Sequence, residues 1–112
     1  MNHAKPLSVK FYRTQAGHEP AREWLRSLDR EEKKTIGEDI KTVQYGWPLG
    51  MPLVRKLEPN LWKIRTSLGA RIARILFTVR GNVIILLHGF IKKSQKTPSQ
   101  DLSTARHRRN TL

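Results

Sequence analysis

The sequence predicts an α+β fold in the order β-α-α-β-β-β-α, in which the helices, an N-terminal hairpin and a short C-terminal helix, pack on one face of a mainly antiparallel, twisted sheet. Apolar residues recur with the 3.6-residue period of a helix between residues 20 and 43, and with the two-residue period of a strand from residue 54 onward. The strand-like segments are joined by short connections, which favour antiparallel neighbours because a parallel return needs a long crossover.

The first element is a short strand at residues 7–11, where apolar and polar residues alternate as LSVKF. After a loop at residues 14–18, Pro20 suits the first position of a helix. One apolar stripe with the spacing i, i+3, i+4, i+7 follows on this helix, at Ala21, Trp24, Leu25 and Leu28.

A second helix is expected after Asp29, which can cap its N-terminus while Glu32 completes a capping box. Gly37 lowers helix propensity, so we expect it to allow a close approach of the two helices. The run YGWP at residues 45–48 ends the helix. The buried face of this helix should consist of Ile36, Ile40 and Val43.

Segments of strand character follow at residues 54–57, 61–66, 72–79 and 83–88. The connections between them, EPN, SLG and RGN, have the chemistry of turns. Thr97 can then cap a short final helix that has Pro98 at its first position. With no long Pro/Gly/Ser-rich stretch to divide it, the chain of residues 1–112 is expected to form a single domain.

The charge of the chain is strongly positive and unevenly distributed. Lys and Arg number 22 against 9 Asp and Glu, which gives a formal charge of +13. Residues 1–50 hold nine basic and seven acidic side chains, whereas residues 51–112 hold thirteen and two. Such a basic surface concentrates polyanions, although charge alone does not separate RNA from DNA, an anionic membrane or an acidic protein.

Several classes of protein are excluded by what the sequence lacks. It contains no cysteine, so disulfides and thiolate metal sites are ruled out. It has no signal-peptide pattern and no apolar run of membrane-span length, so we expect a soluble, cytoplasmic protein without a membrane partner. Phosphate-loop, zinc-protease and EF-hand patterns are also absent, and we expect neither a cofactor nor a metal.

The basic residues of the strands should gather on one face of the sheet. In WKIR at residues 62–65, period two places Trp62 and Ile64 toward the helices and Lys63 and Arg65 on the opposite, exposed face. Arg74 of the next strand should lie beside them. Lys and Arg are common on the solvated face of an antiparallel sheet, but no acidic residue between positions 59 and 100 balances these charges.

The segments LWKIR at residues 61–65, RILF at 74–77 and LLHGFIKKSQKTP at 86–98, together with the order of elements, resemble the RelE/ParE superfamily of bacterial type II toxins. The closest likeness is to the HigB-like, phage-derived branch. This resemblance implies a toxin that cleaves mRNA in the ribosomal A site, without a metal, through attack of the 2′-hydroxyl on the adjacent phosphate. It also implies a cognate HigA-like helix-turn-helix antitoxin, with which a toxin–antitoxin heterotetramer could form.

The resemblance also assigns roles to residues. Lys63 and Arg65 match the basic pair proposed as base and phosphate stabiliser, and Arg74 matches the clamp on the scissile phosphate. Lys93, or Lys92 if the register slips by one, matches the proposed general acid. Lysine can transfer a proton when neighbouring cations lower its pKa, whereas arginine stays charged. Further RNA contacts are expected from Lys92, Lys96, Arg71, Arg106, Arg108 and Arg109, unless the last three belong to a frayed chain end.

Some features leave alternatives open. RelE-type sites carry a tyrosine near the C-terminus, but no tyrosine follows Tyr45 here. His88 is either a hydrogen-bonded structural imidazole or a general acid or base. Asp101 and His107 are six residues apart on a helix and should face different directions. Trp47 and Trp62 either stack on bases or, as we favour, pack in the core.

The target is open too, because one fold can serve more than one activity. A ParE-like inhibitor of DNA gyrase would share this architecture. A relative that binds nucleic acid without cleaving it would share the basic surface as well.

Overall fold

The computed structural model describes residues 6–93 and 98–112. Within these ranges no helix is both long enough and apolar enough to cross a membrane. In chain order the elements are β1 (Ser8–Phe11), α1 (Pro20–Arg26), α2 (Arg30–Gly46), β2 (Val54–Glu58), β3 (Leu61–Ser67), β4 (Ile72–Arg80), β5 (Val83–Ile91) and α3 (Ser99–Asn110).

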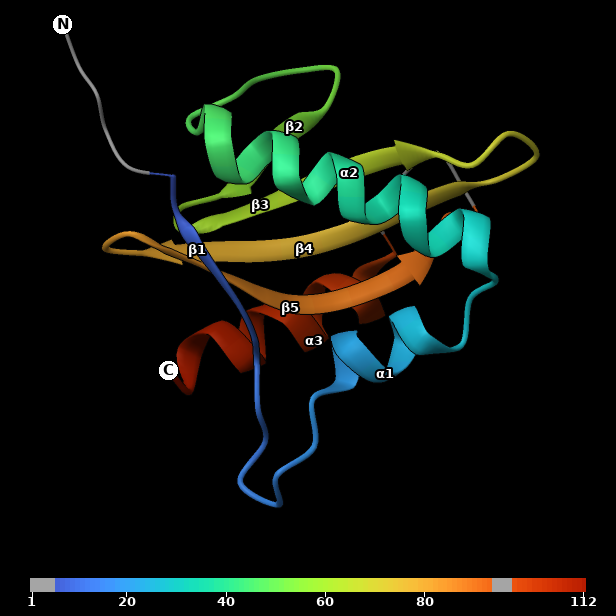
Figure 1. Cartoon of the computed structure of the whole chain (residues 1–112). Helices are drawn as coiled ribbons and strands as arrows, with labels where there is room; N and C mark the ends of the chain where they lie inside the picture. The colour runs from blue at the N-terminus through green and yellow to red at the C-terminus, as the bar shows by residue number, and fades with distance from the viewer. Residues whose placement is uncertain (1–5, 94–97) are drawn as a thin grey trace, which may run out of the picture.

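The strands form one five-stranded sheet in the order β1-β5-β4-β3-β2 (Figure 1). Strands β2 to β5 are antiparallel neighbours, as the short turns predicted, and β1 runs parallel to β5. The two helices connect β1 to β2 at the opposite edge of the sheet. All four predicted segments after the helices form strands, so the order β-α-α-β-β-β-α was one strand short.

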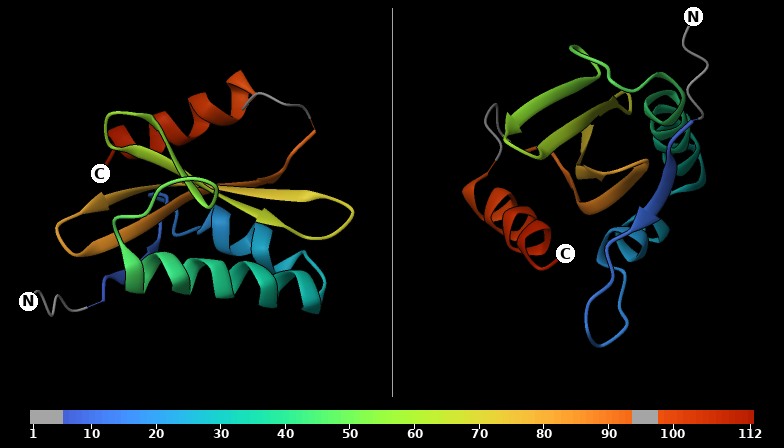
Figure 2. Two further views of the ribbon diagram at one scale, coloured as in Figure 1. Left: turned by 90° about the horizontal axis from the view of Figure 1, so that it is seen from above. Right: turned by 90° about the vertical axis from the view of Figure 1, so that its left-hand side faces the viewer.

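Helices cover both faces of the sheet. Helices α1 and α2 lie on one face and α3 lies on the other (Figure 2). The prediction that the helices pack on one face was therefore wrong for α3. The physical reason is that the central strands are apolar on both sides, so the second face also needs a cover. The residues buried on that face are Leu61, Leu76, Leu87 and Phe90, and they pack with Ala105 of α3.

The helical hairpin is largely as predicted. The Asp29 carboxylate accepts a hydrogen bond from the Glu32 backbone N–H at 2.9 Å, and the Glu32 side chain completes the capping box. Gly37 does not mediate a close approach, because it is exposed and no atom lies within 4 Å of the position of an added Cβ. The glycine that meets a helix is Gly89 of β5, against the ring of Trp24 in α1.

A bulge in β5 changes which residues face α3. Leu76 pairs with His88 and Phe77 pairs with Leu86, so Leu87 is an extra residue in the strand. Leu87 packs with the α3 cluster and His88 bonds to α3 side chains, so both face the same helix. The bulge reverses the alternation of faces along the rest of β5.

Helix α3 begins at Ser99 with Pro98 as its N-cap, one residue later than predicted. Thr97 and Lys96 lie outside the described residues. The helix continues to Asn110, so the alternative of a frayed end was wrong for the arginines of this segment.

Candidate functional site

A pocket of about 310 Å³ opens on the α3 side of the sheet. Among the described residues, no acidic side chain lines it. One wall is formed by Met51, Pro52 and Leu53. The remaining lining residues, here called the cation pocket, are Arg55, Lys63, Arg65, Arg74 and Lys92.

Strand register brings these cations together. Arg55 of β2 pairs with Lys63 of β3, and Arg65 of β3 pairs with Arg74 of β4. Each pair consists of residues directly opposite in antiparallel strands, whose side chains point to the same face of the sheet. Lys92 joins them from the end of β5, where its backbone N–H donates to the Ile72 carbonyl at 2.7 Å. Three adjacent strands and the end of a fourth thus contribute to one pocket.

Two of these cations are buried. The exposed fraction is 6% for Lys63 and 2% for Arg74, whereas Arg65 is exposed. The predicted face was right, but the expectation that these side chains lie on an exposed surface was wrong for Lys63 and for Arg74. Its cross-strand neighbour in β4 is Leu76, and that of Arg74 in β5 is Phe90, so apolar side chains of the α3 cluster flank the two charges.

Burial and mutual repulsion alter proton affinities in the pocket. Desolvation, followed by the charges of the neighbouring cations, lowers the pKa of Lys63 from 10.5 to about 8. Desolvation and nearby arginines also lower the pKa of Arg74 and that of Lys92. Arginine nevertheless remains charged in a protein. The pocket therefore combines fixed positive charges with a lysine that exchanges its proton near neutral pH.

Of the residues predicted to flank the site, some line the cation pocket and others make contacts elsewhere. Lys92 lines the pocket, and Lys93 is not among its lining residues. Arg71 forms a bidentate ion pair with Glu32 of α2, with both N–O distances at 2.7 Å. Arg71 therefore ties the β3–β4 turn to the helical hairpin.

The arginines near the end of α3 hold this helix on the sheet. Arg106 and Arg109 both bond to the Glu58 carboxylate, each with a shortest distance of 2.8 Å. These hydrogen bonds lower the pKa of Glu58 to about 2. Arg108 instead donates to the Leu87 carbonyl at 2.8 Å.

His88 is held at both ring nitrogens. Its Nε2 lies 2.6 Å from an Asp101 oxygen, and the Arg108 guanidinium donates to Nδ1 at 3.4 Å. Both ring nitrogens therefore have protein partners, which favours the structural interpretation of His88. Leu76 lies between Lys63 and His88 in one cross-strand row, which separates them by about 10 Å.

The contact between Asp101 and His88 was not predicted from the sequence. Asp101 contacts His88 and not His107, because α3 crosses β5 where the bulge presents the imidazole. Nothing local in the sequence indicates that contact. In the described ranges, no group of three or more His, Asp or Glu side chains could hold a metal ion.

Arg55 was also missed, although a signal existed. It lies in the strand predicted at residues 54–57, and extending the two-residue alternation to VRKL would have placed it beside Lys63. Trp47 and Trp62 pack against the core, as we favoured. Their ring centroids are 5.0 Å apart, and both rings also contact Phe77.

Comparison with protein families matches residues 23–110 to the family described as phage derived protein Gp49-like (DUF891). The matched range runs from α1 through α3 and contains every residue of the cation pocket. A search of the curated proteins found no match.

Proposed function

The chain belongs to the Gp49-like family of phage-derived proteins, which is known as a family of RelE/HigB-like toxins, and we propose that it is the toxin of a type II toxin–antitoxin system that cleaves mRNA. The observation that carries the proposal is the cation pocket with its titratable Lys63. Fixed positive charges stabilise a phosphate as negative charge develops on it, and a neutral lysine can accept a proton.

The proposed reaction needs a base, an acid and a clamp. Neutral Lys63 takes the proton of the 2′-hydroxyl, and the 2′-oxygen forms a bond to the adjacent phosphorus. Arg65 and Arg74 bind the non-bridging oxygens of the pentavalent phosphorane, and Arg55 adds positive charge beside Lys63. The bond to the 5′-oxygen breaks, and Lys92 gives that oxygen a proton. The products are a 2′,3′-cyclic phosphate and a 5′-hydroxyl, so only RNA is a substrate.

Two features of the pocket support this division of labour. Lys63 is the cation with a pKa of about 8, so a useful fraction is neutral near physiological pH. Lys92 lines the pocket where Lys93 does not, which favours Lys92 as the proton donor. The rate of cleavage should rise with pH through about 8, where half of Lys63 is neutral.

The proposal includes the partners of the toxin. The substrate is mRNA in the ribosomal A site, and the activity arrests translation in the cytoplasm. A HigA-like antitoxin should present an acidic surface, because the chain carries a formal charge of +13.

The test is 5′-end mapping of transcripts after brief induction of the wild type, of Lys63→Met and of Arg65→Gln. Lys56→Gln is the matched control, because Lys56 pairs with Trp62 and so lies on the opposite face of the sheet. We expect cuts within translated frames for the wild type and the control, and none for the two pocket variants. Loss of the cuts when initiation is blocked would support ribosome dependence.

The alternatives give different outcomes. Arrested cells with intact transcripts would contradict the nuclease and point to DNA gyrase. Growing cells with intact transcripts would leave a protein that only binds nucleic acid. Circular dichroism of each purified variant checks that the fold is retained.

A further inference from the structure

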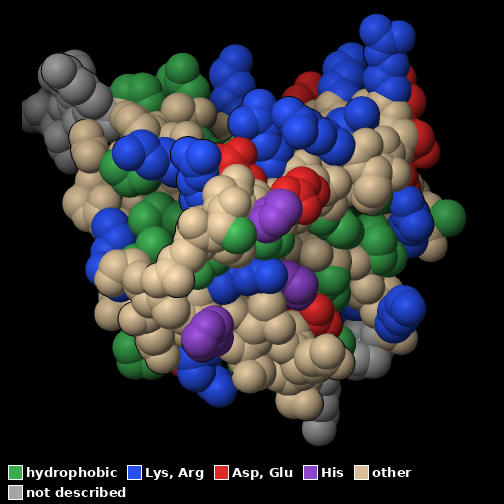
Figure 3. All heavy atoms as spheres, turned by 90° about the horizontal axis from the view of Figure 1, so that it is seen from below, with side chains coloured by type: hydrophobic (Ala, Val, Ile, Leu, Met, Phe, Trp, Pro, Cys, Tyr) green, Lys and Arg blue, Asp and Glu red, His purple; other side chains and the backbone are tan. Residues whose placement is uncertain are grey.

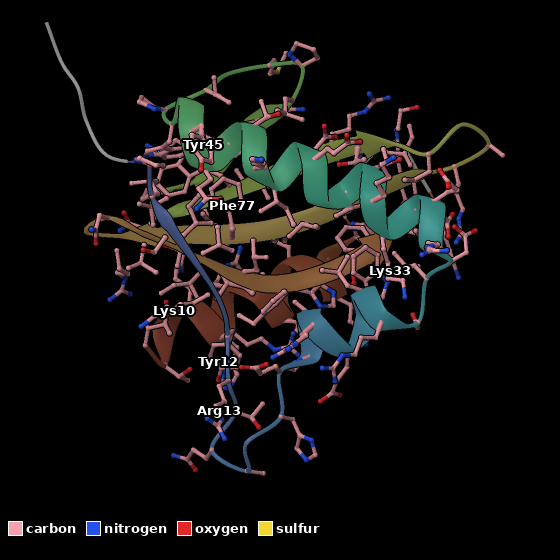
Figure 4. All side chains as sticks on the ribbon, viewed as in Figure 1. Lys10, Tyr12, Arg13, Lys33, Tyr45 and Phe77 are labelled. Atoms are coloured by element: carbon pink, nitrogen blue, oxygen red, sulfur yellow. The ribbon has the colours of Figure 1, made fainter. Side chains whose placement is uncertain are left out.

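A second cavity, of about 580 Å³, lies between the loop after β1 and the last turn of α3. It shares no lining residue with the cation pocket. Figure 3 views the side where α1, α3 and this loop lie, and basic, acidic and histidine side chains meet near its centre. Figure 4 labels Tyr12 and Arg13 where β1 runs into the loop. The lining residues are Tyr12, Arg13, Thr14, Gln15, Ala16, His107, Arg108, Thr111 and Leu112.

Hydrogen bonds fix both walls of this loop–helix cavity. The Tyr12 backbone N–H donates to the Leu86 carbonyl at 2.9 Å, and the Tyr12 hydroxyl lies 2.9 Å from the Thr111 hydroxyl. The loop is closed by a bond from the Thr14 N–H to the His18 carbonyl at 2.8 Å. Gly17 has a φ of +92°, a conformation that glycine adopts without strain. The cavity is therefore formed before any ligand arrives.

The charges around this cavity differ from those elsewhere on α3. Arg106 and Arg109 are neutralised by Glu58, but Arg108 points to the other side of the helix and lines the cavity. In residues 6–93 and 98–112, neither Arg108 nor Arg13 forms an ion pair with a carboxylate. No acidic side chain is among the described lining residues. Two arginines thus line one cavity, and neither pairs directly with a carboxylate of the described residues.

Arg108 is held in place for such a role. Its guanidinium donates to the Leu87 carbonyl and lies 5.8 Å from the centroid of the Tyr12 ring. It is half-buried, so an anion that reaches it meets a charge with reduced hydration. The remaining guanidinium N–H groups can bind a phosphate in bidentate fashion, and the Thr14 and Thr111 hydroxyls add polar groups.

We propose that the loop–helix cavity binds a nucleotide, with its phosphate between Arg13 and Arg108. The volume exceeds what a phosphate alone fills and lies within the range of small-molecule sites. The proposal does not rest on the chain being a nuclease. Its ligand is either a free mononucleotide or one nucleotide of a single-stranded RNA, because both present the same phosphate and base.

The experiment is a titration of the ¹⁵N-labelled full chain, followed by NMR, with inorganic phosphate, adenosine monophosphate and a short single-stranded RNA. We expect saturable shifts of the amides that line the loop–helix cavity, and tighter binding of the mononucleotide than of phosphate. Arg13→Gln should weaken binding about tenfold, because it removes charge-assisted hydrogen bonds. Arg26→Gln, which removes one exposed arginine of α1 outside the cavity, should leave binding unchanged.

The relative affinities of the phosphate, the mononucleotide and the RNA distinguish the possible ligands. Tighter binding of the RNA than of the mononucleotide identifies a strand-binding site, and equal affinity identifies a site for free nucleotide. Phosphate binding as tightly as the mononucleotide would overturn the nucleotide assignment. Shifts confined to residues of the cation pocket, or equal weakening by Arg13→Gln and Arg26→Gln, would overturn the proposal itself.

Discussion

Replacing Lys63 by methionine should stabilise the protein at neutral pH while removing the proposed base. Lys63 is 6% exposed, and its pKa is about 8 where an unfolded chain has 10.5. At about 1.4 kcal/mol per pH unit, this difference sets a ceiling of about 3 kcal/mol on the cost of the buried charge. Water in the open pocket screens part of it, so we expect Lys63→Met to raise the free energy of unfolding by about 1–2 kcal/mol.

The pH dependence gives this prediction its sign. Below pH 8 both the folded and the unfolded chain hold the Lys63 proton, so the folded state carries the full cost. Between pH 8 and 10.5 the unfolded chain binds more protons at Lys63, so its contribution raises the stability of the wild type as pH increases. The advantage of Lys63→Met should therefore be constant below pH 8 and shrink toward pH 10.5.

Urea unfolding of both proteins at pH 7, 9 and 10.5, followed by tryptophan fluorescence, measures this difference. Other groups titrate over the same range, but they do so in both proteins and cancel in the comparison. Lys56→Met is the matched control, because Lys56 is exposed on the other face and should show no such pH dependence. A Lys63→Met protein less stable than the wild type at pH 7, or a difference independent of pH, would refute the reasoning.

Three further predictions concern the fold and the proposed site. Glu58→Gln should lower the free energy of unfolding at pH 7 by about 1–2 kcal/mol. The difference from the wild type should shrink as the pH falls from 4.5 toward about 2, because acid protonates Glu58 in the wild type. A pH-independent difference in urea unfolding would contradict this. Gly89→Ala should cost about 1–3 kcal/mol because its Cβ meets Trp24, and an unchanged melting temperature would exclude that contact. Arg55→Gln should slow RNA cleavage about 100-fold, and Lys56→Gln should not; equal rates would remove Arg55 from the site.

Local patterns predicted the sheet faces of β3 and β4 correctly. The alternation of WKIR was enough to place Lys63 and Arg65 on the face opposite Ile64, because successive residues of a strand point to opposite faces of the sheet. The capping box of α2 was equally local, since Asp29 and Glu32 are three residues apart.

The rest of the site depends on long-range contacts. Strict alternation from the start of β5 would put Lys93 on the face of the cation pocket, but the extra residue Leu87 reverses the parity, and Lys92 lines the pocket instead. A bulge of this kind leaves no clear mark in a run such as VIILLHGFI. The burial of Lys63 and Arg74 likewise depends on side chains from other elements, which no single segment contains.

The stability and the activity of Lys63→Met, measured together, test whether the buried Lys63 serves catalysis. If Lys63 had no part in the reaction, Lys63→Met would still stabilise the protein, because the buried charge is removed, but cleavage would be unchanged. A protein that only binds RNA would gain stability on the substitution without ever having cleaved a transcript. If Lys63 is the base of a nuclease, Lys63→Met should be more stable than the wild type and should no longer cleave RNA. In the wild type the charge of Lys63 would then be kept for the reaction although it lowers the stability of the fold. Phosphate binding would offset that cost, so a non-cleavable RNA should stabilise the wild type more than Lys63→Met.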